Sequence, residues 1–445
     1  MTMRRLGGFL LVLMASVFAT QCSAQSGGSS ASDYGKPAPE WLRESGMFNG
    51  WYMPWTDDML ERVKGFPLIV TPTVTPDIVQ KLHARGVRVI CYVNAYVINN
   101  ARAIEREIQR RRQGGELIPP EWESVAESPF NRMMDLTQHP DWIWVGPDGY
   151  PRKKPATYEE VYNSNPVCLQ ACPNAPGFRE AELAAVKALM AMGADGLFLD
   201  CVENSHRKLC WGPEFGLHKH VHPEWDDNQA WLSLQKEIYN LVKSYGPDKV
   251  VLLNGGSGAG SPDYLCYADA YMLESYILTH VSTRRWQSWE QIQKMAEQTA
   301  PAVKAGKVVL ALSYVGYTSN SIEEDAFYAY ACARLYGYCW ADWFTLADAR
   351  ATLLYRLKLG APRSQVRESN GILYKLFQNG VVVVNPNYED RELQVKTGFT
   401  FLREVLTNRR YAFHDESKGI TLDTQELQAI IPAESGRVFI SGFSN

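Results

Sequence analysis

Short runs of β-branched and aromatic residues alternate with helix-like patterns of apolar residues along most of this 445-residue chain. Such alternation is typical of βα units around a parallel sheet. We predict strands at 48–53, 67–73, 87–94, 194–200, 249–254, 270–274, 307–314 and 338–342. Helices that end near a glycine are predicted at 76–85, 178–192, 228–245, 288–305 and 323–336. Eight repeated units predict an α/β fold that closes into a (β/α)8 TIM barrel.

One connection breaks this rhythm, because residues 95–193 separate the third predicted strand from the fourth. It contains a charged stretch with helical character at 101–112, an aromatic stretch at 139–144 and a turn at 147–149. Loops of this length are usually functional. We expect the connection to cover the substrate face of the barrel, and a peripheral insertion is the alternative.

From about Leu359 the pattern changes to short alternating strands without long helices. These strands are predicted at 371–377, 380–384, 392–396, 401–406, 428–431 and 437–440. The pattern predicts a small all-β domain, an antiparallel β-sandwich with turns at 379–380 and 385–387. Its strands carry no cluster of titratable residues, so we expect the domain to pack against the barrel rather than to catalyse.

The N-terminus has the features of an export signal, with Arg4 and Arg5 ahead of an apolar run at 6–19 and small residues near Cys22. The run is too short to be a good membrane span, and no later run reaches spanning length. We therefore expect a signal peptide at 1–24, a flexible Ser/Gly-rich linker at 25–40, the catalytic barrel at 41–358 and the β domain at 359–445.

The predicted location is secreted or periplasmic. A lipid-anchored surface protein is the alternative, because Cys22 precedes a flexible segment, although Gln21 fits a lipoprotein signal poorly. The net charge is −4 and the sequence has no long Lys/Arg run, whereas nucleic-acid binding needs a basic surface. We expect no nucleic-acid partner.

Eight cysteines follow the leader: Cys91, Cys168, Cys172, Cys201, Cys210, Cys266, Cys332 and Cys339. An even number in an exported chain predicts at least one disulfide, with Cys168/Cys172 and Cys201/Cys210 as local candidates. No CxxC pair occurs, so we expect no structural zinc site, no metal and no other cofactor. The alternating histidines at 218–222 are expected to form a polar loop near the substrate, and metal binding there is the alternative.

Two carboxylic acids end apolar strands, where burial is costly unless the group serves a site or a firm partner. Asp200 ends the fourth predicted strand and Glu274 ends the sixth. Residues at the carboxyl ends of barrel strands point into the active-site mouth. Glycoside hydrolysis requires two such carboxylates, one as acid/base and the other as nucleophile or water activator. A purely structural partner is the alternative for each.

Aromatic and polar residues at other strand ends form a candidate sugar-binding surface: Trp51, Tyr52, Tyr92, Asn94, Asn254, Tyr314, Trp340 and Asp342. Aromatic rings pack on the apolar faces of sugars, while Asn, Asp and Tyr bind their hydroxyl groups. The alternative is a core position, because Trp and Tyr are also common in barrel cores. Glu203 and His206 follow the fourth strand closely. They are candidates to assist Asp200 or to contact substrate, and solvated loop positions are the alternative.

The segment Ala194-Asp195-Gly196-Leu197-Phe198-Leu199-Asp200 resembles the fourth-strand motif of glycoside-hydrolase-like barrels related to the endo-α-1,4-polygalactosaminidases. Residues 86–94 are similar to the third strand of such barrels, and 379–386 with 435–438 to the β domain behind them. The resemblance implies Asp200 and Glu274 as the catalytic pair. The long third connection and the histidine-rich segment depart from that family, so the relatives' substrate is not implied.

We therefore predict a glycoside hydrolase that acts on an extracellular or surface polysaccharide or its oligosaccharides. A retaining mechanism is expected, and an inverting one is the alternative. Asp200 is the expected nucleophile because its side chain is shorter, and Glu274 the expected acid/base because its side chain is longer and the aromatic surroundings of Tyr271 and Tyr276 can raise its pKa. The alternatives are a non-catalytic carbohydrate-binding protein on the same scaffold and a metal-dependent hydrolase such as a deacetylase.

Overall fold

The computed structural model of the chain describes residues 31–43, 46–50, 55–118, 121–147, 149, 168–202, 209–255, 260–277, 287–315, 321–342, 351–412 and 426–441. Contacts divide the chain into two compact units. The first consists of Met1–Pro39, Phe48–Leu273 and Pro301–Val308, and the second of Glu40–Met47, Glu274–Ala300 and Val309–Asn445.

Eight strands form a closed barrel in the order β1-β10-β9-β8-β7-β6-β3-β2. They are β1 (Met47–Asn49), β2 (Leu68–Thr71), β3 (Arg88–Asn94), β6 (Gly196–Asp200), β7 (Val250–Leu253), β8 (Ala270–Leu273), β9 (Val308–Leu312) and β10 (Cys339–Asp342). Register is parallel from β2 through β3, β6 and β7 to β8, and between β9 and β10. The predicted TIM-barrel fold class is confirmed, and every predicted barrel strand is present.

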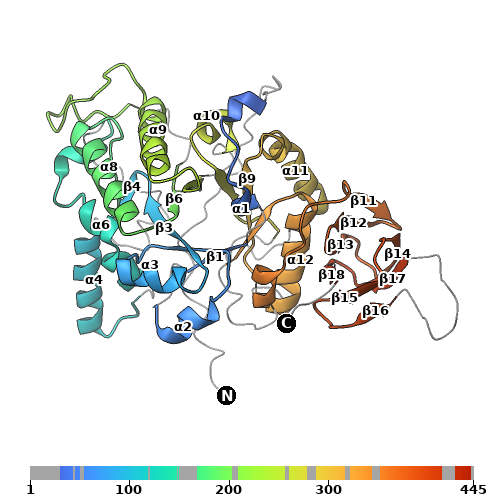
Figure 1. Ribbon diagram of the computed structural model, residues 1–445. Helices are drawn as coiled ribbons and strands as arrows, with labels where there is room; N and C mark the ends of the chain where they lie inside the picture. Colours follow the sequence, from blue (N-terminus) through green and yellow to red (C-terminus); the bar gives the residue numbers. More distant parts are fainter. Residues whose placement is uncertain are drawn as a thin grey trace, which may run out of the picture. The chain divides into compact units, whose positions relative to one another are not determined.

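Helices of the first unit follow its strands. They are α2 (Asp57–Arg62), α3 (Pro76–His83), α8 (Pro176–Ala191), α9 (Asp227–Ser244) and α10 (Pro262–Leu265). Thr75 Oγ1 caps α3 by accepting the N–H of Ile78 at 3.3 Å, and Asp226 with Gln229 forms a capping box at the start of α9. α8 and α9 lie side by side (Figure 1).

Buried acids stabilise the starts of two barrel strands. Asp195, just before β6, accepts hydrogen bonds from the Val89 N–H at 2.9 Å and Lys249 Nζ at 3.0 Å. Asp269, just before β8, accepts from the Val251 N–H and Lys243 Nζ, both at 2.8 Å. Each acid thus pairs with its neighbouring strand at the amino-terminal end of the barrel, the end associated with stability.

The connection between β3 and β6 contains its own secondary structure: β4 (Val97–Asn99), α4 (Ala101–Gly114), α5 (Glu121–Glu127), α6 (Pro129–Met133), η2 (Pro140–Trp142) and β5 (Cys168–Gln170). The helix expected at 101–112 is confirmed. β4 and β5 pair antiparallel, a two-stranded sheet that the sequence did not predict. Whether the connection covers the substrate face stays a prediction.

Residues 31–39 were expected in a flexible linker, but they pack on the first unit. Tyr34 in η1 (Ala31–Tyr34) is buried. Lys307 Nζ donates to the carbonyl of Lys36 at 2.6 Å, and the Ala38 N–H donates to Gly306 at 2.9 Å. Residues 31–39 thus make contacts within the first unit, and the linker boundaries stay a prediction. The predicted signal peptide and Cys22 lie outside the described residues.

The second unit contains α1 (Glu40–Arg43), most of α11 (Trp289–Lys304), α12 (Ile322–Leu335), η5 (Ala351–Arg356) and the C-terminal strands. No helix within the described ranges is both long and apolar enough to cross a bilayer. One C-terminal sheet has the order β11-β12-β13-β18-β15-β16, and β14 pairs with β17 in another. The bounds are β11 (Arg367–Ser369), β12 (Ile372–Phe377), β13 (Gly380–Asn385), β14 (Arg391–Lys396), β15 (Phe401–Glu404), β16 (Arg410–Ala412), β17 (Glu426–Ile431) and β18 (Ser435–Ile440).

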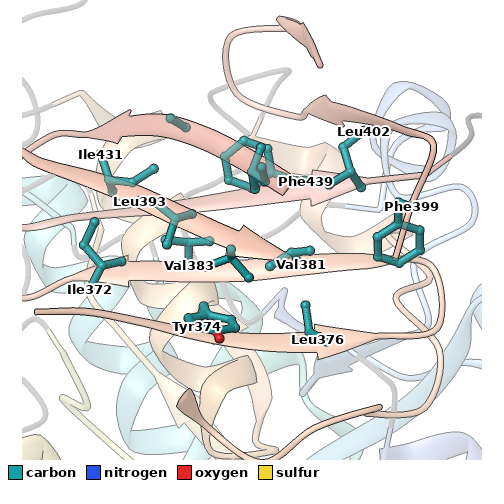
Figure 2. Packing of buried hydrophobic residues seen from close by; sticks show 13 residues of the cluster. Ile372, Tyr374, Leu376, Val381, Val383, Leu393, Phe399, Leu402, Ile431 and Phe439 are labelled. Atoms are coloured by element: carbon teal, nitrogen blue, oxygen red, sulfur yellow. The ribbon is translucent and has the colours of Figure 1, made fainter. Parts of the chain in front are cut away.

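The C-terminal strands enclose one apolar core. Figure 2 shows Val381, Val383, Leu393 and Phe439 gathered between the strands, and burial of such side chains is the main favourable term in folding. The predicted β domain is confirmed, while the short strands β11 and β16 were not predicted. Beside this core, α12 packs against β18, where Gly436 lies so close that a Cβ atom would stand 2.7 Å from Ala331 Cβ.

Cysteines within the described residues are free thiols: Cys91, Cys172, Cys201, Cys210, Cys266, Cys332 and Cys339. The expected Cys201/Cys210 and Cys168/Cys172 disulfides are therefore wrong. Cys201 belongs to the turn after β6, whereas the sulfurs of Cys172 and Cys210 lie beside histidine nitrogens. The side chain of Cys168 is outside the described residues.

Candidate active site

Asp200 ends β6 and is held by donors from three neighbouring segments. Tyr92 Oη donates to Oδ2, Asn254 Nδ2 donates to Oδ1 at 2.9 Å, and the Cys201 N–H donates to Oδ1 at 2.8 Å. The Asp200 side chain is buried, with 3% of the residue exposed. Both carboxylate oxygens of this buried side chain thus have protein donors.

The register of β3 against β6 explains the contact between Tyr92 and Asp200. Tyr92 pairs with Phe198, and Asn94 with Asp200, across β3 and β6. Because side chains two residues apart lie on the same face of a strand, Tyr92 and Asn94 point the same way. Tyr92 stacks on Phe198 with ring centroids 5.8 Å apart, and its hydroxyl also lies 3.3 Å from Asn94 Oδ1. The β3–β6 pairing therefore presents a hydroxyl to Asp200.

Asn254, the residue after β7, is fixed by its own backbone. Its N–H donates to Leu199 at 2.8 Å, and its carbonyl accepts from the Val202 N–H at 3.0 Å. The two bonded residues, Leu199 and Val202, lie on either side of Asp200 in the sequence. These bonds therefore position the Asn254 side-chain amide beside the Asp200 carboxylate. A side chain held in this way is pre-organised for its task.

Glu274 follows β8 directly in the second unit and is half-buried. Tyr314, two residues beyond β9, donates its hydroxyl to Glu274 Oε1. The turn after Glu274 is fastened to the same segment, because the Tyr276 N–H donates to Leu312 at 2.7 Å and the Ile277 N–H donates to Ser313 Oγ at 3.3 Å. The chain after β9 thus sets the position of this second carboxylate.

The two carboxylates share a local design. Each comes at the end of a barrel strand and accepts a tyrosine hydroxyl. Each is followed by a non-glycine residue in the left-handed region, Cys201 with φ 63° and Ser275 with φ 61°. Such backbone is uncommon outside glycine and clusters at functional sites.

Other predicted site residues have varied positions. Asn94 is buried next to Tyr92, and Asp342 is fully buried at the end of β10. Trp340 is also fully buried, with ring centroids 4.8 Å from Tyr355 and 5.8 Å from Tyr330, a core-packing environment. Trp51, Tyr52, Glu203 and His206 lie outside the described residues.

Tyr276, expected in the aromatic surroundings of Glu274, makes its hydrogen bond to α12. Its side chain is fully buried, and its hydroxyl donates to the carbonyl of Cys332 on α12 at 3.4 Å. Burial raises the pKa of the Tyr276 hydroxyl well above its ordinary value. Tyr314, rather than Tyr276, is the tyrosine that contacts Glu274.

The described residues also include a group that can hold a metal ion. Ligand atoms of Cys172, Cys210, His218 and His220 all lie within 4.8 Å of one another. The sequence analysis considered metal binding by the histidines at 218–222 only as an alternative, and it did not connect them with Cys172 and Cys210, because these ligands come from two separate segments.

A family model described as hypothetical glycosyl hydrolase family 15 (GHL15) matches residues 122–381, more than half of the chain. The match runs from α5 to β13 and includes Asp200 and Glu274. The chain belongs to this family. This GHL15 protein is therefore a glycoside hydrolase on a TIM barrel, as predicted. No curated protein matches the chain.

Solved structures agree on the fold. The α-amylase from Geobacillus thermoleovorans, complexed with acarbose, is 12% identical with a TM-score of 0.53, covering 91% of this chain and 99% of that one. An Anoxybacillus α-amylase is 11% identical with a TM-score of 0.52, covering 92% and 100%. The glycoside hydrolase domain of PelA from Pseudomonas aeruginosa is 16% identical with a TM-score of 0.42, covering 68% and 97%. At these identities the two amylases support the barrel architecture of this GHL15 chain and say nothing of its substrate.

Proposed function

We propose that this GHL15 chain cleaves glycosidic bonds of an extracellular or surface polysaccharide, with Asp200 and Glu274 as its two catalytic carboxylates. The observation that carries the proposal is their shared setting. Each lies at the carboxyl end of a barrel strand, Asp200 as the last residue of β6 and Glu274 directly after β8, accepts a tyrosine hydroxyl and precedes a residue with positive φ. In TIM-barrel enzymes, catalytic residues come from the ends of several different strands.

Strand order supports joint action of the two groups. β7 lies between β6 and β8, so the strands that carry Asp200 and Glu274 are next-nearest neighbours. Adjacent strands are spaced by about 4.8 Å, which separates these two backbones by roughly 9–10 Å. Retaining glycosidases place their two carboxyl groups ~5–5.5 Å apart and inverting ones ~6.5–9.5 Å apart.

In the proposed retaining mechanism, Glu274 protonates the glycosidic oxygen while Asp200 attacks the anomeric carbon. The bond to the leaving sugar breaks, and a glycosyl ester on Asp200 forms. Glu274, now ionised, then takes a proton from water, whose oxygen displaces Asp200 and restores both groups. Tyr92 and Asn254 orient Asp200, and Tyr314 orients Glu274.

The predicted export of the enzyme is consistent with a polymeric substrate outside the cell. The leader at 1–24 supports secretion or transfer to the periplasm, and a lipid anchor at Cys22 is the other form of export. Either route brings the barrel to polysaccharide outside the cell. A substrate screen that includes polymers with amino sugars identifies the sugar.

The test is a screen of purified polysaccharides, including α-glucans and amino-sugar polymers, for released oligosaccharides. Mass spectrometry should detect products with the wild-type protein and none with Asp200→Asn. If Asp200→Asn releases the same products at the wild-type rate, the proposal fails.

Stereochemistry tests the mechanism separately. Proton NMR of the first-formed product should show the same anomeric configuration as the cleaved bond. An inverted first product would remove the nucleophile role from Asp200 while leaving the carboxylate pair intact.

A further inference from the structure

A second site lies in the first unit, outside the carboxylates. Cys172 precedes α8, while Cys210, His218 and His220 belong to the segment between β6 and α9. The Sγ atom of Cys172 lies 3.5 Å from His220 Nε2, and that of Cys210 lies 3.6 Å from His218 Nε2. All four ligand atoms fall within 4.8 Å of one another, and both cysteines are buried.

These separations match a tetrahedral zinc centre. Zinc lies at about 2.3 Å from a thiolate sulfur and about 2.0–2.1 Å from a histidine nitrogen, so tetrahedral angles place S and N about 3.5–3.6 Å apart. The measured S···N distances are 3.5 and 3.6 Å. A Cys₂His₂ set is one of the standard compositions of structural zinc sites.

The surroundings favour the metal-binding form of Cys210. Backbone N–H groups of Val145 and Gly212 each donate to its sulfur at 3.4 Å. N–H donors of this kind stabilise negative charge on a ligand sulfur, so the surroundings of Cys210 suit a metal-bound thiolate.

Gly212 makes room for the histidine. A Cβ atom at this position would stand 2.1 Å from His218 Cε1 and 2.5 Å from Nε2, closer than any side chain tolerates. The turn is closed by the Leu217 N–H, which donates to the Gly212 carbonyl at 2.9 Å. The glycine therefore lets the His218 ring lie against the backbone with Nε2 facing Cys210.

Asn174 ties the histidine segment to the segment that carries Cys172. Its Nδ2 donates to the His222 carbonyl at 2.7 Å, and its Oδ1 accepts the His222 N–H at 2.9 Å. Its own carbonyl accepts the Val221 N–H at 2.9 Å. The two halves of the ligand set are thus held together by protein contacts.

We propose that Cys172, Cys210, His218 and His220 bind one Zn²⁺ as a closed structural site. All four tetrahedral positions are supplied by protein, which leaves no open position for water or substrate. The ion fastens the segment that follows the Asp200 turn to the start of α8. This role differs from the metal-dependent hydrolase considered as an alternative from the sequence, and it does not depend on the catalytic assignment.

The test measures zinc in the full chain purified from zinc-containing medium without chelator. Elemental analysis should find about one Zn²⁺ per chain, because binding to a folded Cys₂His₂ site is strong. Exchange for Co²⁺ should give the visible d–d bands of tetrahedral cobalt with thiolate charge transfer. Chelation should lower Tm, and added Zn²⁺ should restore it.

Matched variants locate the ligands. His220→Ala and Cys210→Ser should lose the zinc. His222→Ala and Cys266→Ser should keep it, because the His222 ring stacks on Trp225 with centroids 3.6 Å apart and Cys266 Sγ donates to the Asp263 carbonyl. Should the ligand-deleting variants fail to fold, His220→Cys should still bind Co²⁺, with stronger thiolate charge transfer.

Two results would overturn the proposal. The first is that the wild-type protein contains no zinc and, after its cysteines are reduced, does not bind Co²⁺. A Cys172–Cys210 disulfide found by peptide mapping would explain that result. The other is equal zinc loss in His220→Ala and His222→Ala, which would point to unspecific histidine binding.

Discussion

Carboxylates at the two ends of one strand have different neighbours. Asp195 precedes β6 and pairs with Lys249 at 3.0 Å, whereas Asp200 ends β6 and accepts the Tyr92 hydroxyl and the Asn254 amide. In TIM barrels the amino-terminal ends of strands serve stability and the carboxyl-terminal ends carry chemistry. The place of an acid on its strand therefore separates a structural role from a proposed catalytic one.

Asp195→Asn should destabilise the protein in a pH-dependent way. Burial raises the pKa of Asp195, but hydrogen bonds from the Val89 N–H, Lys249 and His83 outweigh it and leave the pKa below its ordinary value. The carboxylate then contributes fully above the unfolded pKa of about 3.9, and this contribution is lost as pH falls through the folded pKa. At pH 7 we expect the free energy of unfolding to fall by about 1–3 kcal/mol.

Urea unfolding of both proteins from pH 7 toward pH 3 checks this expectation. The difference between wild type and Asp195→Asn should shrink at the acid end. A difference that widens there would show that Asp195 is not held ionised by its partners.

Sequence reasoning proposed Asp200 and Glu274 because barrel closure brings strand ends to one rim, and the fourth-strand resemblance points to the same two residues. It did not find which tyrosine meets which carboxylate. Tyr276 is close to Glu274 in sequence, yet its hydroxyl reaches Cys332, and Tyr314 makes the contact instead. That choice depends on side-chain packing, which a linear pattern does not encode.

At the scale of elements, strand positions were predictable and strand ends were not. The seventh strand was predicted to run to Tyr314, but β9 ends at Leu312. The Ser313 Oγ and the Tyr314 hydroxyl, just beyond this end, contact the turn that carries Glu274. β4 and β5 were missed because three residues are too few to show a period of two.

Gly436→Val should weaken the packing of β18 on α12. A Cβ atom at this position would lie 2.8 Å from the carbonyl of Phe327, which belongs to a helix backbone and cannot give way. Overpacking of this kind typically costs about 1–3 kcal/mol. Thermal unfolding should show a lower Tm for Gly436→Val.

Gly114→Ala is the matched control, because the nearest atoms to its added Cβ belong to the exposed side chain of Glu116. Alanine also favours the helical conformation at this last residue of α4. Equal losses of Tm in the two variants would mean that close approach to α12 is not the cause.

At the scale of the whole molecule, the four proposed zinc ligands could not be recognised as one site from the sequence pattern. Cys172 lies 38 positions before Cys210, and the two histidines follow on a separate turn. No local spacing marks all four as one site, since Cys172 lies before β6 and the other three lie after it. The same cysteines were therefore interpreted as disulfide candidates.

Removal of residues 359–445 should give an aggregation-prone protein. The C-terminal strands pack on α12, and Lys375 Nζ donates to the Leu335 carbonyl at its last turn at 2.8 Å. Their loss exposes apolar surface on that helix. Size-exclusion chromatography should find aggregates, and soluble, fully active protein without the domain would contradict its stabilising role.

The most direct test of the central claim compares hydrolysis rates of three variants on the active polysaccharide. Asp200→Asn and Glu274→Gln should each reduce kcat/KM by at least about 10²–10⁴-fold, because each removes a group that acts in the transition state. Folded Asp195→Asn, altered at the opposite end of β6, should stay within about tenfold of wild type. Near-normal turnover by Glu274→Gln or Asp200→Asn would contradict the carboxylate pair and make Glu203 the next acid to test.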